Sequence, residues 1–259
     1  MELFPTAKFK FNIAEALKSG FYVSGTTGCG KSDIAMRCVD KLRKQGVICI
    51  VFDPSQDWLA RYPADQFVKP NTLSGKPFLA EVRLVGTTVV DISTLTLTQT
   101  KTLVENFCEN IFLQQAMRMP EKRNFYFIIF EEAQTEFPQG ILSAKRMQNA
   151  VRLLTQGRNF KIRMGVVTQF AAMLDKNALR FQNQRYYGWT AEPNDVSYIS
   201  DMIGDEQAKS LQFFKSGEFL YSCPVLGISE KIKIRPYKPK GLNIPIDKDV
   251  NRQNTSLLR

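Results

Sequence analysis

The run Gly-Thr-Thr-Gly-Cys-Gly-Lys-Ser at residues 25–32 constrains the fold more than any other part of the chain. It fits the pattern G-x-x-x-x-G-K-[ST] and directly follows the apolar run Phe21-Tyr22-Val23. Apolar residues then recur at helical spacing from Ile34 to Leu42. A strand, a glycine loop and a helix in this order form the context in which the pattern binds a nucleoside triphosphate. The segment therefore predicts a P-loop fold, and the complete motif with both flanks argues against a glycine turn that binds nothing.

Each residue type in this loop has a physical reason. Glycines let the backbone turn tightly and bring its N–H groups toward phosphate oxygens, and the N-terminus of the next helix also favours an anion. Lys31 is expected to reach the β and γ oxygens of ATP, and the Ser32 hydroxyl is the expected Mg²⁺ ligand. The predicted nucleotide-binding residues are Gly25, Thr26, Thr27, Gly28, Cys29, Gly30, Lys31 and Ser32.

A second segment, residues 125–132, is an apolar run that ends in the pair Glu131-Glu132. A buried strand with this ending places both carboxylates at the carboxyl edge of a parallel sheet, beside the phosphate loop. There Glu131 is expected to hold a Mg²⁺-bound water, and Glu132 to accept a proton from the attacking water. Glutamate pairs also occur by chance at strand ends, but the long apolar run and the preceding P-loop favour an active site.

Two further polar residues follow from the pattern of strands. The predicted strand 162–167 ends in Thr168-Gln169, so the Gln169 amide is expected to lie between the loop and the carboxylates, within reach of a γ-phosphate. Arg158 precedes the same strand. Spacing alone does not fix the role of either residue, and an arginine in a basic stretch is more often a solvated surface charge.

The order of apolar segments predicts an α/β fold with a central, mostly parallel sheet flanked by helices, of the RecA-like P-loop class. Residues 1–237 are expected to form one motor domain, and residues 238–259 a flexible basic tail. Residues 55–76 are expected to be an irregular excursion. The runs 219–221 and 228–234 predict a final hairpin.

Composition excludes several kinds of site. Among 259 residues there is no histidine, and the five cysteines form no C-x-x-C pair, which argues against zinc and Ser-His or Cys-His catalysis. No apolar run approaches the roughly 20 residues that span a bilayer, and no signal-peptide pattern opens the chain. We therefore expect a cytoplasmic protein, or a virion-associated one if it is viral.

The formal net charge is +10, and it is unevenly distributed. Between residues 145 and 185, Asp175 is the single acid among nine basic residues: Lys145, Arg146, Arg152, Arg158, Lys161, Arg163, Lys176, Arg180 and Arg185. Such a field suits a polyanion such as DNA, whose counterions are released on binding. Charge alone leaves an ordinary solvated surface equally open.

Taken together, these segments resemble the HerA–FtsK superfamily of P-loop ATPases, ring-forming motors that pump DNA. The resemblance extends from about residue 21 to residue 220. Its motifs are residues 25–32, Phe52-Asp53-Pro54, Glu131-Glu132-Ala133-Gln134, Gln156-Gly157-Arg158, Thr168-Gln169, Pro193-Asn194-Asp195 and Gly217-Glu218-Phe219. Glu131 stands where the family usually has aspartate, and Gln134 where a histidine is often found.

The resemblance implies a hexameric ring that translocates double-stranded DNA. It makes Gln169 a sensor, and Arg158 a finger that reaches the neighbouring subunit's site, with Arg152 as the second candidate. Magnesium and ATP are the implied cofactors. The chain is short for the family, and in its size it is similar to viral genome-packaging ATPases. This similarity would make a capsid or portal-vertex protein a partner.

Other functions remain open from the sequence. A HerA-like cellular translocase or a plasmid conjugation ATPase would carry the same motifs. A small-molecule kinase shares the loop, but normally has an arginine-bearing lid, and its pattern lacks the glutamate pair and the Gln-tipped strand. A nucleotide-gated assembly protein that hydrolyses little is the third class.

Overall fold

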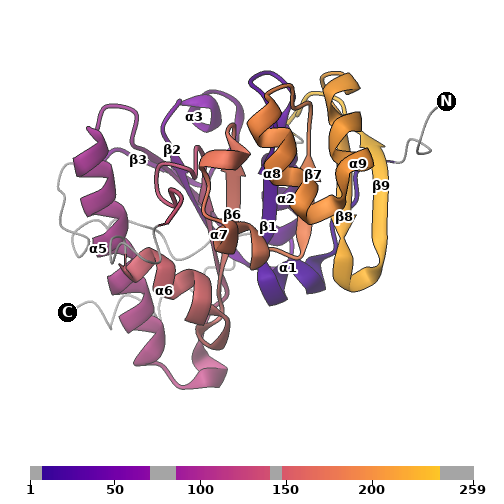
Figure 1. The fold of residues 1–259 in the computed structure, drawn as a ribbon. Helices are drawn as coiled ribbons and strands as arrows, with labels where there is room; N and C mark the ends of the chain where they lie inside the picture. The colour runs from indigo at the N-terminus through magenta and orange to yellow at the C-terminus, as the bar shows by residue number, and fades with distance from the viewer. Residues whose placement is uncertain (1–7, 71–85, 141–147, 240–259) are drawn as a thin grey trace.

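The structure, a computed structural model, describes residues 8–70, 86–140 and 148–239. Lys145, Arg146 and the part of the predicted tail from residue 240 onward lie outside these ranges. The described residues form one mixed sheet of nine strands with helices on both faces (Figure 1). This is the α/β fold with a mostly parallel sheet that the sequence predicted.

The strands lie in the order β3-β4-β2-β5-β6-β1-β7-β8-β9. Strands β1 to β7 pair in parallel, whereas β8 pairs antiparallel with both β7 and β9. The bounds are β1 Phe21–Ser24, β2 Ile48–Asp53, β3 Gln66–Val68, β4 Thr87–Asp91, β5 Tyr126–Phe130, β6 Ile162–Thr168, β7 Gln184–Tyr187, β8 Glu218–Cys223 and β9 Ile228–Lys233. The predicted final hairpin is thus present, and β6 separates the P-loop strand β1 from the carboxylate strand β5.

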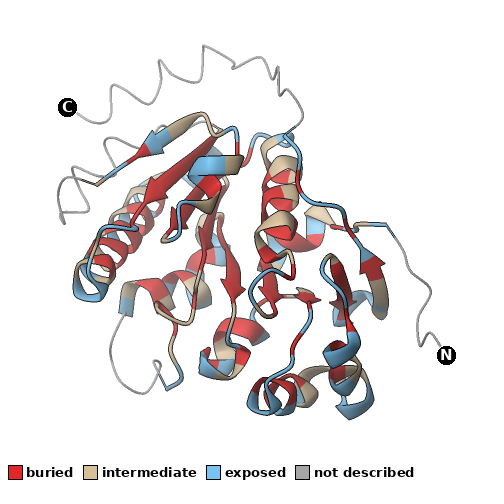
Figure 2. Cartoon of the chain, turned by 90° about the horizontal axis from the view of Figure 1, so that it is seen from above, coloured by how far each residue is buried: buried red, intermediate tan, exposed pale blue. Residues whose placement is uncertain are grey.

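Helices α5 to α9 cover one face of the sheet, and α1 to α3 the other (Figure 1). Their bounds are α1 Ile13–Ser19, α2 Lys31–Arg43, α3 Asp57–Arg61, α5 Leu97–Ala116, α6 Gln148–Gln156, α7 Lys176–Arg180, α8 Pro193–Ile203 and α9 Asp205–Ser210. Because both faces are covered, the central strands are buried along their length, as Figure 2 shows. This explains why they are continuous apolar runs rather than alternating ones.

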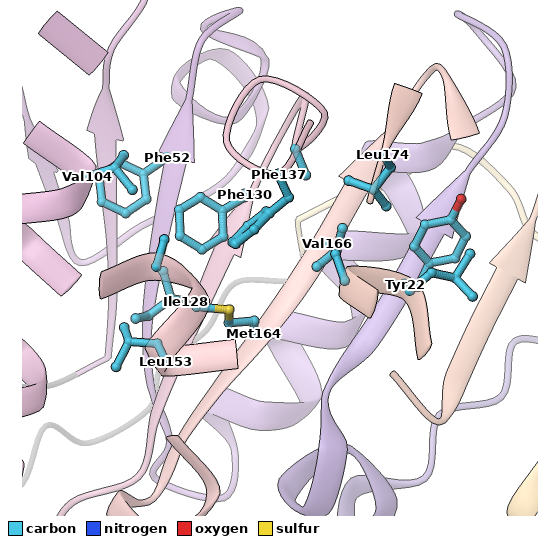
Figure 3. Packing of buried hydrophobic residues seen from close by; sticks show 14 of the residues in the cluster. Tyr22, Phe52, Val104, Ile128, Phe130, Phe137, Leu153, Met164, Val166 and Leu174 are labelled. Carbon is cyan, nitrogen blue, oxygen red and sulfur yellow. The ribbon is translucent and has the colours of Figure 1, made fainter. Parts of the chain in front are cut away.

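Aromatic packing fixes the strands that carry the predicted carboxylates. The rings of Phe52 in β2 and Phe130 in β5 are stacked 5.4 Å apart, and Phe137 meets Phe130 edge-on at 5.3 Å (Figure 3). Phe137 lies just past Glu131 and Glu132, and the backbone N–H of Ala133 donates to the carbonyl of Val167 at 2.8 Å. The turn after β5 is therefore anchored at both ends.

Residues 55–70 differ from the expected irregular excursion, since they contain helix α3 and edge strand β3. The buried carboxylate of Asp53 explains the helix. Its Oδ2 accepts from the backbone N–H groups of Trp58, at 2.9 Å, and Leu59, at 3.2 Å. The carboxylate thus caps the start of α3, although it lies four residues before the helix in sequence. No apolar pattern marks so short an element.

None of the helices in the described ranges is long and apolar enough to cross a membrane.

Candidate functional site

The glycine loop has the backbone that the motif requires. Gly25, Gly28 and Gly30 have φ values of 143°, 80° and 105°, a region that side chains disfavour. At Gly25 a β-carbon would also lie 2.8 Å from Cys29 Sγ and 3.1 Å from the carbonyl oxygen of Trp189. A side chain at residue 25 would therefore clash with its surroundings, which explains the glycine at the entry to the loop.

Two segments contact the glycine loop: the one between β7 and α8, and the one just before β8. Its Thr26 N–H donates to the carbonyl of Trp189 at 2.7 Å, and the Gly217 N–H donates to the carbonyl of Cys29 at 2.8 Å. The Ser216 hydroxyl donates to the carbonyl of Gly28 at 2.9 Å. These bonds preorganise the loop, and the buried Cys29 side chain is a packing residue under it. The motif segment around Gly217 thus supports the loop from a distance of nearly two hundred residues.

Lys31 and Ser32 occupy the first turn of α2, directly after Gly30, which caps the helix in a left-handed conformation. The Lys31 side chain is buried and its Nζ lies 3.4 Å from the Thr26 carbonyl, over the glycine loop. An ammonium group and several N–H groups are thereby gathered at one helix N-terminus. This arrangement suits a polyphosphate.

The strand order brings Gln169 between the loop and the glutamate pair. Its Oε1 accepts from the Thr27 hydroxyl at 2.7 Å, and its Nε2 donates to Glu132 Oε1 at 2.5 Å. One amide therefore connects the P-loop with the predicted base. Gln169 thus lies between the loop and Glu132, and its role as a sensor stays a prediction.

Glu132 is held in an unusual conformation. Its φ of 54° is left-handed, which costs a non-glycine residue on the order of 1 kcal/mol and is typical of functional sites. Its second oxygen, Oε2, accepts from Gln134 Nε2 at 2.8 Å, and Gln134 Oε1 accepts from the Thr168 hydroxyl at 2.6 Å. Two amides thus orient the carboxylate. Gln134, which the sequence did not mark as catalytic, is a positioning residue.

Glu131 lies deeper than Glu132 and faces helix α3. The indole Nε1 of Trp58 donates to Glu131 Oε1 at 2.7 Å, and Trp58 is placed there because Asp53 caps α3. Burial raises the pKa of Glu131 to about 7, Trp58 opposes this shift, and the nearby charge of Glu132 adds to it. Trp58 is a site residue that the sequence analysis missed, because nothing local links residue 58 with residue 131.

The residues present fit a magnesium site that is completed by phosphate. In the part of the chain that the structure describes, no three His, Cys, Asp or Glu side chains gather to hold a metal by themselves. Magnesium is commonly bound by one or two protein oxygens together with substrate phosphates and waters. The Ser32 hydroxyl in the first turn of α2 and the buried Glu131 carboxylate would provide such oxygens.

Arg158 lies away from these residues, at the opposite edge of the sheet. It belongs to a short 3₁₀ turn, Gly157–Phe160, that precedes β6, whereas Gln169 follows the same strand. Arg158 is exposed, and no hydrogen bond or ion pair of its side chain occurs among the described residues. The alternative, Arg152, stacks on the Phe112 ring at 3.7 Å and donates to Gln156. Arg158 therefore cannot serve its own loop, and it is the freer of the two arginines.

A neighbouring carboxylate predicts a pH effect on stability. Glu136 is buried beside a cavity lined by Glu131 and Glu132, and its Oε2 has no hydrogen-bond partner in the described structure. Burial raises its pKa from 4.5 to about 7, with Lys101 opposing and Glu105 adding to the shift. The folded state thus holds this proton more tightly than the unfolded state, so stability is lost as the pH rises from about 4.5 through 7.

Replacing Glu136 with Gln should remove this loss. We expect Glu136→Gln to match the wild type at pH 5 and to exceed its free energy of unfolding at pH 8 by on the order of 2–3 kcal/mol. Urea unfolding at both pH values measures the difference. The exposed Glu109→Gln is the matched control, with little change at either pH. Equal stability of Glu136→Gln and wild type at pH 8 would contradict the prediction.

Comparison with known proteins bears on the fold and on the segment that carries the glycine loop. Residues 12–70, which include the glycine loop, match the family model of the type IV secretion-system coupling protein DNA-binding domain. No curated protein matches the chain.

Several solved structures share the fold. The genome packaging NTPase B204 from Sulfolobus turreted icosahedral virus 2, in complex with AMPPCP, aligns with a TM-score of 0.60 at 15% identity over 85% of this chain and 99% of that one. VirB4 of Thermoanaerobacter pseudethanolicus aligns with a TM-score of 0.57 at 11% identity, over 84% of this chain and 89% of that one. The pCW3 conjugation coupling protein TcpA, with ATPγS, aligns with a TM-score of 0.52 at 14% identity, over 84% of this chain and 60% of that one.

These findings confirm the P-loop ATPase fold. The family-model match over residues 12–70 agrees with the resemblance to the HerA–FtsK superfamily that was drawn from the motifs.

Proposed function

We propose that the protein hydrolyses ATP and uses the energy to move double-stranded DNA. One observation supports hydrolysis above all, namely the Gln169 amide that joins Thr27 of the P-loop to Glu132. This contact requires β6 to lie between β1 and β5, as it does. It supports the proposal that a carboxylate and an amide act together at the γ-phosphate and its attacking water.

Each residue then has a chemical task. The loop N–H groups and Lys31 bind the β- and γ-phosphates, and Glu132 takes the proton from the attacking water while Gln134 and Gln169 fix its orientation. Magnesium, when bound by Ser32 and through water by Glu131, would neutralise charge on the phosphates. Gln169 contacts both the loop and the base, so it is suited to respond when the γ-phosphate leaves.

A second subunit completes the proposed site. Arg158 lies at the amino edge of the sheet, opposite the loop, where a head-to-tail neighbour in a ring would meet the carboxyl edge of the next chain. Such an arginine stabilises the charge of the transition state from outside. We propose a ring, by analogy a hexamer, in which Arg158 is this finger.

DNA is the proposed cargo because the chain carries a cluster of basic residues and because of the proteins to which it is similar. The described basic residues that follow Arg152 include Lys161, Lys176 and Arg180 outside the core, with Asp175 the acid among them. The matched family model is a DNA-binding domain, and the first structural relative is a genome packaging NTPase. We propose contacts with the phosphate backbone rather than with bases.

Packaging of a viral genome, with a capsid or portal-vertex partner, is the favoured task. Such a protein would be cytoplasmic or virion-associated. A plasmid or cellular translocase is the alternative, and TcpA and VirB4 support it.

DNA-dependent turnover tests this proposal. We expect duplex DNA to raise the rate of ATP hydrolysis at low ionic strength, and the stimulation to fade as salt increases, because backbone contacts release counterions. Phosphate release measured with and without duplex over a salt series gives the answer. A rate of ATP hydrolysis that is the same with and without duplex at low salt would contradict translocation. Transfer of phosphate to nucleosides or metabolites in the same assay would instead indicate a kinase.

A further inference from the structure

A basic cavity opens at the edge of the sheet opposite the glycine loop. It has a volume of about 360 Å³ and lies where α1 ends, β6 begins and the segment after α7 returns to the sheet. The labels of α1, α6 and α7 mark this lower region in Figure 1, whereas α3 lies at the upper edge. The cavity is therefore separate from the site around Gln169.

Four cationic side chains line this cavity, and no Asp or Glu does. They are Lys18, Arg158, Arg163 and Arg180. Lys18 is paired with Glu15 at 2.6 Å on the outside, but none of the three arginines has an ion pair within the described structure. Neighbouring like charges without a counter-charge repel each other, and a bound anion relieves this repulsion.

Arg163 makes this arrangement more than a solvated surface. Its side chain is 7% exposed, its Nη1 donates to the Ile162 carbonyl at 2.6 Å, and its Nε has no partner among the described residues. Burial, followed by the charge of Arg158, lowers the pKa of Arg163 to about 10. A buried guanidinium with a spare donor and no carboxylate is costly unless an anion accompanies it.

We propose that this cavity binds the polyphosphate of a nucleotide. A cavity of about 360 Å³ admits a compact anion, whereas a DNA duplex is too large for it and would reach only the exposed Arg158 and Arg180. Guanidinium groups suit phosphate oxygens because they donate in pairs. The polyphosphate comes either from a free nucleotide or from a nucleotide held by the P-loop of a second copy. The second source rests on the proposed ring, in which Arg158 would act together with Arg163 and Arg180.

Binding of pyrophosphate to the isolated chain tests the cavity without hydrolysis. Lys31→Ala serves as the background, because it weakens the P-loop site. Calorimetric titration with pyrophosphate at low ionic strength should give a dissociation constant that Arg180→Gln raises about tenfold, the loss of one charged hydrogen-bonding partner. Lys176→Gln is the matched control: it removes another exposed charge from the same helix, and Lys176 pairs with Asp201 and does not line the cavity. In addition, the Arg163 Nε–H resonance should shift during the titration.

The outcomes separate the possibilities. An unchanged dissociation constant in Arg180→Gln, or equal weakening by Lys176→Gln, overturns the proposal. Duplex DNA that depends on Arg180 while pyrophosphate does not also overturns it. To identify the source, the Lys31→Ala chain is mixed with a Glu132→Gln chain loaded with ATPγS, and association is followed by fluorescence anisotropy. Association that Arg180→Gln in the first chain abolishes assigns the polyphosphate to a second copy, and pyrophosphate binding without association assigns it to free nucleotide. Because pyrophosphate binding needs neither turnover nor a ring, it can succeed where the proposed function fails.

Discussion

Replacing Glu132 with Gln is expected to slow ATP hydrolysis by roughly 10²–10⁴-fold, the usual contribution of a general base. The amide has the size of the carboxylate, but its one oxygen can accept from only one of Gln134 and Gln169, which donate to the two oxygens of Glu132. What it lacks is a lone pair basic enough to take a proton from water. Single-turnover hydrolysis with saturating Mg·ATP measures the chemical step, and fluorescent-nucleotide binding should remain close to that of the wild type.

Glu121→Gln is the matched control. Glu121 is exposed in the short turn Pro120–Lys122 before β5, at the edge of the sheet opposite the loop, so its neutralisation should leave hydrolysis unchanged. Turnover that persists in Glu132→Gln would remove the base from the mechanism. The chain would then fit the class of nucleotide-gated assembly proteins better than a motor.

The parts of this site that the sequence predicted are those encoded locally. Residues 25–32 dictate their own backbone, since three glycines take positive φ values there, and the run into Glu131-Glu132 dictates a buried strand with polar ends. The position of Gln169 followed from parallel strands, because their carboxyl ends meet at one edge of a sheet. The order β1-β6-β5, which lets Gln169 bridge loop and base, was not contained in any single motif.

The parts that the sequence did not predict depend on contacts between distant residues. Trp58 donates to Glu131 across a sequence separation of 73 residues, and it does so only because Asp53 caps α3. Helix α3 has five residues, too few for a periodic apolar pattern to reveal. Gln134 stands where the related family often has histidine, and its role became visible only with its bonds to Glu132 and Thr168. Pairwise geometry, not residue type, identifies such positioning residues.

Replacing Arg158 with Ala is expected to reduce hydrolysis by about 10³–10⁵-fold, the contribution of an arginine supplied by a neighbour. The exposed side chain makes no contact that holds the described fold together, so the free energy of unfolding should change little. Arg152→Ala is the matched control: its guanidinium stacks on Phe112, and its loss should reduce stability more than turnover. The reverse result, with Arg152→Ala inactive and Arg158→Ala active, would move the finger to Arg152.

Mixing two inactive chains distinguishes a finger supplied by a neighbour from a residue needed within its own chain. Arg158→Ala keeps its loop and base but offers no finger, whereas Glu132→Gln offers a finger but has no base. A site is complete where an Arg158→Ala chain supplies the base and its Glu132→Gln neighbour supplies the finger. In a cyclic assembly mixed at random in equal amounts, about a quarter of the sites have this arrangement, so activity should return to at most about a quarter of the wild-type rate. If Arg158 acted inside its own chain, no mixture would regain activity, because every chain would carry one defect. The rate per wild-type chain should also rise with protein concentration, since a lone chain cannot bring the amino edge of its sheet to its own glycine loop.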